Sequence, residues 1–102
     1  MTPLREAFCA MMAHYPGSDA IQCCNWARAE RGSRALLSYV RNTARAVRRM
    51  SATYDTYATD AAWLPLLDAL IAELTTGNIM PREDANGLLA DAEAAYRAAG
   101  GT

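Results

Sequence analysis

The chain of 102 residues contains no lysine, a single histidine and a single phenylalanine. With His14 as the only histidine, the sequence offers no recognisable pairing of a nucleophile with a catalytic base. Valine and isoleucine are also scarce, because two Val and three Ile stand against ten Leu and 22 Ala. Since β-branched residues favour strands whereas Ala and Leu favour helices, this composition predicts an all-α fold.

The three cysteines, Cys9, Cys23 and Cys24, form no CxxC motif. Adjacent cysteines on one helix diverge by about 100°, so we do not expect these thiols to bind a metal together with His14. The number of cysteines is odd, and the first ten residues lack the layout of a secretory signal. Together these features predict a reducing location. We therefore expect a cytoplasmic protein.

Other motifs for chemistry are missing as well. The sequence has no glycine-rich phosphate loop and no paired acid and base, so we expect a non-enzymatic protein without cofactor or small-molecule substrate. The longest weakly charged stretch, residues 61–74, contains a proline and two acids. It is too short and too charged to cross a bilayer, and no membrane partner is expected.

Apolar residues recur at helical spacing in five segments that are separated by stop signals. We expect one domain, residues 1–102, folded as a compact bundle of four to five helices at about 3–15, 19–31, 34–50, 60–76 and 81–98. Thr2 and Pro3 suit the cap and first position of the first helix. The fourth helix carries the most leucines and should be central. Its Pro65 must lie in the first turn, because a deeper proline would remove a hydrogen bond.

Charge is separated along the chain although the total is only −1. Seven of the ten arginines lie within residues 28–49, where Glu30 is the only acid, so this segment carries +6. The chain from Met50 onward carries −6. Such an asymmetry predicts a basic surface on the third helix and an acidic surface farther along the chain.

Helical geometry gathers the arginines of the third helix. Arg34, Arg41, Arg45 and Arg48, here called the arginine ridge, project within about 60° of one another. Like charges four residues apart repel by a few tenths of a kcal/mol, which favours a partner rich in phosphates or carboxylates. Tyr residues just beyond the ridge could stack on unpaired bases. The full set of candidate binding residues is Arg31, Arg34, Arg41, Arg45, Arg48, Arg49, Tyr54 and Tyr57.

Two other interpretations fit the same pattern. The ridge could pair with the acidic C-terminal helix and otherwise be solvated, as in a structural subunit of a larger assembly. Gly32-Ser33 between two helices also permits a helix-turn-helix transcriptional regulator, which would be expected to dimerise on paired half-sites. The sequence is compatible with both a monomer and a homodimer. The partner of the ridge can be a nucleic acid or an acidic protein surface.

Short length, a single all-helical domain, no catalytic motif and a segregated charged face resemble the small anti-CRISPR inhibitors of phages and mobile elements. The resemblance lies in the character of the whole chain. It implies a stoichiometric binder of a CRISPR effector complex, such as a type I surveillance complex. The partner would then be a CRISPR effector subunit or its exposed nucleic acid. This inhibitor or adaptor function is the leading hypothesis.

Overall fold

The computed structural model describes residues 2–15, 32–78 and 80–101, and every regular element in these ranges is helical. The elements are α1 (Pro3–Met12), α3 (Gly32–Thr53), the short 3₁₀ helix η1 (Asp55–Tyr57), α4 (Ala58–Ala61), α5 (Leu64–Thr76) and α6 (Arg82–Ala98). The expected all-α, single-domain bundle is confirmed. The expected helix at 19–31, and with it Arg31, lies outside the described residues.

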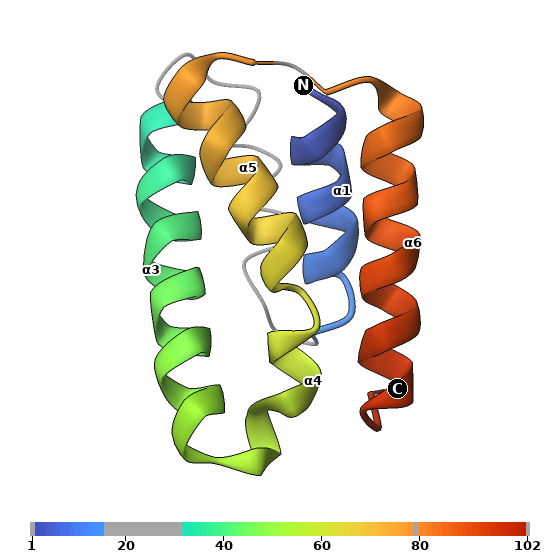
Figure 1. Ribbon diagram of the computed structural model, residues 1–102. Coiled ribbons are helices and arrows are strands. Elements are labelled where there is room, and N and C mark those ends of the chain that lie inside the picture. Colours follow the sequence, from blue (N-terminus) through green and yellow to red (C-terminus); the bar gives the residue numbers. More distant parts are fainter. Residues whose placement is uncertain (1, 16–31, 79, 102) are drawn as a thin grey trace.

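Helix α5 is central, as its leucines predict. It packs against α3, α1 and α6, and its Leu66 and Leu70 are fully buried. In Figure 1, α3 and α6 form the two outer edges of the bundle, with α5 and α1 between them. Phe8 from α1 and Leu36 from α3 complete the same core with no exposed surface. Two helices that the sequence gives opposite charge are thus held on opposite sides of one core.

The expected helix at 60–76 is wrong in its first part. The chain instead forms α4, turns at Ala62 and Trp63, and starts again as α5 with Pro65 in the first turn. Proline has no N–H to donate to the preceding turn, so a continuous helix through this point would lose a hydrogen bond and clash. The break matters for the site because it places Asp60 and Trp63 on a bend rather than on a straight rod.

The other helix ends differ by a few residues from expectation. Helix α1 is shorter than 3–15 and ends in a turn whose Tyr15 amide donates to the Met12 carbonyl over 3.1 Å. Helix α3 is longer than 34–50 by two residues at its start and three at its end. The Thr2 cap is confirmed, since its hydroxyl accepts from the Arg5 amide at 3.4 Å. None of the helices in the described ranges combines the length and apolar character that crossing a bilayer requires.

Candidate functional site

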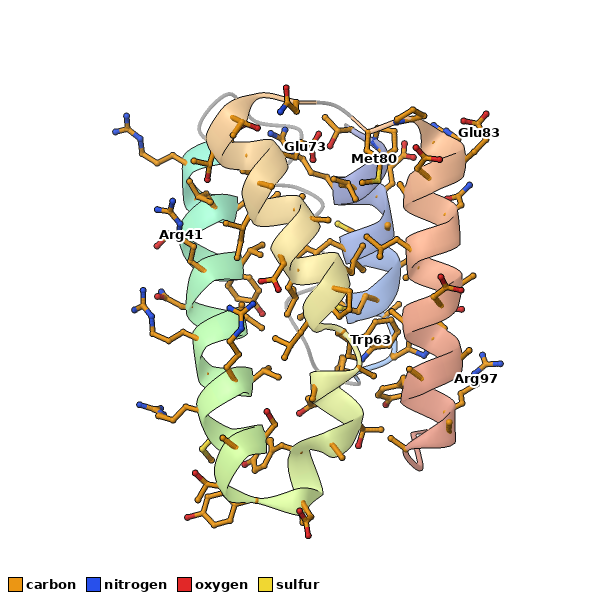
Figure 2. The ribbon with its side chains drawn as sticks, in the orientation of Figure 1. Arg41, Trp63, Glu73, Met80, Glu83 and Arg97 are labelled. Carbon is orange, nitrogen blue, oxygen red and sulfur yellow. The ribbon has the colours of Figure 1, made fainter. Side chains whose placement is uncertain are left out.

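Helix α3 has two sharply different faces. Leu36, Val40 and Ala44 are buried against the core. The opposite face exposes every arginine that the structure describes on this helix: Arg34, Arg41, Arg45, Arg48 and Arg49. Figure 2 shows Arg41 projecting from the edge of α3 away from α1 and α6. The helical geometry inferred from the sequence therefore places the arginine ridge on the solvent side, as predicted.

Three ridge arginines surround a shallow hollow on this face. Arg34, Arg41 and Arg45 border a volume of about 300 Å³. The described residues between them are Leu37, Ser38 and Asn42, and none of the six is acidic. Guanidinium, hydroxyl and amide groups all donate hydrogen bonds. The hollow therefore has the chemistry of an anion site, with three positive charges and neutral donors between them.

The fourth ridge residue has a different role. Arg48 donates to the Asp68 carboxylate of α5 in an ion pair whose side chains are 51% and 49% exposed. About two helical turns earlier on α3, the Arg41 guanidinium donates to the Thr75 hydroxyl of α5 at 3.4 Å. Exposed contacts of this kind contribute about 0–1 kcal/mol each. These contacts between α3 and α5, here called the seam, orient Arg41 and pair Arg48 with an acid. The four arginines of the ridge are therefore not equivalent.

The guanidinium groups of Arg34, Arg45 and Arg49 form no ion pair or hydrogen bond with any residue that the structure describes. The expectation that the ridge pairs with the acidic C-terminal helix is not met in this part of the chain. The described side-chain contacts of α6 go to α1 and the turn after it instead, where Arg82 pairs with Glu6 at 3.1 Å and Glu93 lies 3.4 Å from His14 Nε2. The bundle places α6 too far around the core to neutralise α3.

The two candidate tyrosines follow α3 directly. Tyr54 is 53% exposed, whereas Tyr57 is half-buried. Their ring centroids lie 6.3 Å apart with the planes at 49°. Tyr54 directly follows the end of α3, five residues after Arg49, and an exposed aromatic ring can serve as a stacking surface for a base. Tyr57 is more buried than Tyr54, so Tyr54 is the more accessible of the two rings.

A second polar cluster was missed by sequence reasoning. The Tyr15 hydroxyl donates to Asp60 Oδ1 at 2.7 Å, and Tyr15, His14 and Trp63 all lie around Tyr96, with ring centroids 5.0–6.0 Å from it. Burial, reinforced by the hydrogen bond to Asp60, raises the pKa of the Tyr15 phenol well above its ordinary value. Tyr15 and Asp60, for example, are 45 positions apart in the sequence. No sequence spacing therefore predicts that these residues meet.

One acid in the core is also unexplained by the sequence pattern. Glu73 of α5 is only 5% exposed, and neither carboxylate oxygen has a hydrogen-bond partner within the described ranges. Figure 2 shows it near Met80, at the end of the bundle where α5 stops. Among the residues with described positions, no three His, Cys, Asp or Glu side chains are grouped as metal ligands would be.

Comparison with protein-family models, with curated proteins and with solved structures gives no match. The function therefore has to be argued from the site itself.

Proposed function

We propose that this chain is a small non-enzymatic binding protein whose α3 face contacts the phosphates of a nucleic acid within a nucleic-acid-handling complex. The observation that carries the proposal is the hollow bordered by Arg34, Arg41 and Arg45, whose described lining contains hydrogen-bond donors and no acid. A guanidinium binds two oxygens of one phosphate in a planar, bidentate geometry. Three of them around one hollow make a surface for a chain of phosphates.

The spacing of the arginines supports an elongated partner. Arg41, Arg45 and Arg49 follow one another at intervals of four residues, which is about 6 Å along the helix axis. Arg34 extends the same exposed face toward the start of α3. Tyr54 lies beyond the other end and offers a ring to a base. A single strand running along α3 would meet cations first and a stacking surface last.

The activity proposed for this binding is stoichiometric inhibition or adaptation of the anti-CRISPR kind. The resemblance of the whole chain to such inhibitors supplies the class of target, and the α3 face supplies a means of attachment. The exposed nucleic acid of a type I surveillance complex would supply the phosphates. The helix-turn-helix alternative depends on the segment before Gly32, outside the described residues, and no observation favours it.

The direct test measures how binding depends on salt. A labelled oligothymidylate is titrated with the protein, and anisotropy is followed between about 50 and 200 mM salt. Contacts of Arg34, Arg41, Arg45 and Arg49 with four phosphates of a single strand give a slope of log K against log salt of about −3. Arg45→Ala should make the slope shallower by about 0.7. Arg97→Ala, an exposed arginine at the end of α6, is the matched control and should change nothing.

A second arm addresses the partner. The protein is added to a purified type I surveillance complex, and target-DNA binding by that complex is measured with the wild type and with Arg45→Ala. Inhibition that weakens in the variant supports the proposal. If the protein binds a polyglutamate probe tightly and does not bind the oligonucleotide, the partner of α3 is an acidic protein surface and the proposed nucleic-acid contact is wrong. No binding to either probe and no effect on the complex would refute the proposal.

A further inference from the structure

The bend between α4 and α5 encloses a cavity that the arginine face does not use. Its volume is about 170 Å³, and it lies where α1, α3 and the bend meet. Met11, Val47 and Leu67 form apolar walls, the rings of Tyr15 and Trp63 add aromatic surface, and Asp60 lies at its border. The cavity is partly open rather than fully enclosed.

The polar groups of this cavity are acceptors. Asp60 Oδ1 already accepts from Tyr15, which leaves Oδ2 without a hydrogen-bond partner among the described residues. The Thr43 hydroxyl donates its proton to the Tyr39 carbonyl at 2.9 Å, so toward the cavity it offers only lone pairs. The indole Nε1 of Trp63 is shielded completely and does not reach the open space.

Charge points the same way. Asp60 is the only ionisable residue besides Tyr15 among the described residues of the lining, and no basic side chain belongs to that set. The Tyr15 phenol stays protonated because its pKa is raised, so it keeps Asp60 Oδ1 occupied and adds no charge. An aromatic ring face attracts a cation through its electron-rich centre. A carboxylate in a lining that also contains two aromatic rings therefore favours a positively charged ligand.

The size of the cavity limits the rest of the ligand. An apolar cavity of about 150 Å³ in another protein holds a benzene molecule. We propose that the cavity between α1, α3 and the α4–α5 bend binds a small hydrophobic ammonium ion. Its hydrocarbon part lies against Met11, Val47 and Leu67, and its ammonium group donates to Asp60 beside the Tyr15 and Trp63 rings. The cavity is separate from the arginine ridge, so this inference is independent of the proposed function.

The test uses benzylammonium as the probe and the full chain in solution. Binding is followed by titration calorimetry and by the NMR shifts of the Met11, Val47 and Leu67 methyl groups. Benzyl alcohol has nearly the same shape without the charge and should bind about tenfold more weakly, since a charge-assisted hydrogen bond is lost. Benzoate, which carries the opposite charge, should not bind.

Variants separate the carboxylate from the apolar walls. Asp60→Asn keeps an oxygen for the Tyr15 hydroxyl but removes the charge, and it should abolish the preference for benzylammonium over benzyl alcohol. Asp68→Asn, an exposed aspartate on α5, is the matched control and should leave the affinity unchanged. Tyr15→Phe releases Asp60 Oδ1 and should keep the binding. Thermal melts establish that each variant is folded.

The ammonium group can belong to a free amine or to a lysine side chain of another protein. Comparing benzylammonium with Nα-acetyl-lysine amide, whose only ammonium group is on the side chain, distinguishes these sources. Saturable binding of either compound, seen at the cavity methyl groups, supports the inference. The inference is overturned if neither amine shifts those methyl groups, or if folded Asp60→Asn binds benzylammonium as well as the wild type.

Discussion

The two outer helices of the bundle, α3 and α6, carry charge in opposite ways. Helix α6 has Glu83 and Asp84 in its first turn and Arg97 in its last. Apart from Arg82 at the first position, this is the distribution that a helix dipole favours, with anions at the N-terminus and cations at the C-terminus. Arg82 pairs with Glu6 of α1, and Glu93 contacts His14 in the turn that follows α1. Folding alone accounts for most of the charge on α6.

Helix α3 does the reverse. It has no acid in its first turn and no basic residue in its last, and Arg34 lies in the first turn, where a cation opposes the helix dipole. Arg41, Arg45 and Arg49 repeat at the four-residue spacing at which like charges repel. Only Arg48 is compensated by an acid among the described residues. Charge that folding does not explain is the better evidence for binding, which is why the site is placed on α3.

The largest expected effect separates the two faces of α3. Leu36 is fully buried, so Leu36→Ala should lower the free energy of unfolding by about 2–5 kcal/mol. Urea denaturation measures the loss. Below the unfolding transition, the variant should still bind the oligothymidylate probe within about twofold of wild type, because the ridge is on the other face. The milder Val40→Ala serves if Leu36→Ala does not fold. Lost binding in a folded variant would contradict this separation.

Charge reversal tests the exposed face itself. Arg41→Glu combined with Arg45→Glu should weaken oligothymidylate binding by more than about 100-fold, because two contacts become repulsive. Helical circular dichroism and melting temperature should barely change, since Glu is nearly as good a helix former as Arg. Arg82→Glu with Arg97→Glu is the same change on α6 and should have a much smaller effect. Unaltered oligothymidylate binding in the α3 variant would contradict the assignment of binding to the arginine ridge.

Local patterns and long-range contacts differ in how far the sequence reveals them. The exposed face of α3 could be predicted, because positions 34–49 lie on one helix whose geometry is fixed by its period. The division of the ridge could not, since Asp68 and Thr75 reach it only through the packing of α5 on α3. The cavity at Asp60 likewise depends on three elements meeting. The sequence indicates that Pro65 belongs in the first turn of a helix. The bend beside the cavity also depends on how the surrounding helices pack, which the sequence does not show.

A smaller change examines whether α6 is passive. Gly87 is exposed inside α6, and a Cβ added there meets nothing within 4 Å. Gly87→Ala should therefore raise the free energy of unfolding by about 0.5–1 kcal/mol through helix propensity. Urea denaturation measures the gain, and oligothymidylate affinity should stay constant. Altered affinity would show that the outer face of α6 takes part in binding.

The smallest expected effect concerns the acid that lies beside the ridge. Asp68→Ala removes the partner of Arg48, and because both side chains are about half exposed, stability should fall by less than about 1 kcal/mol. Oligothymidylate binding should instead strengthen a few-fold, because Arg48 becomes available and a repelling carboxylate is gone. The salt slope should steepen by about 0.7 if Arg48 then meets a phosphate. Asp91→Ala removes an exposed acid from α6 and should do neither. If both variants strengthen binding equally, only net charge matters. A gain confined to Asp68→Ala would place the bound strand along the seam between α3 and α5, where Arg41 is already oriented by Thr75.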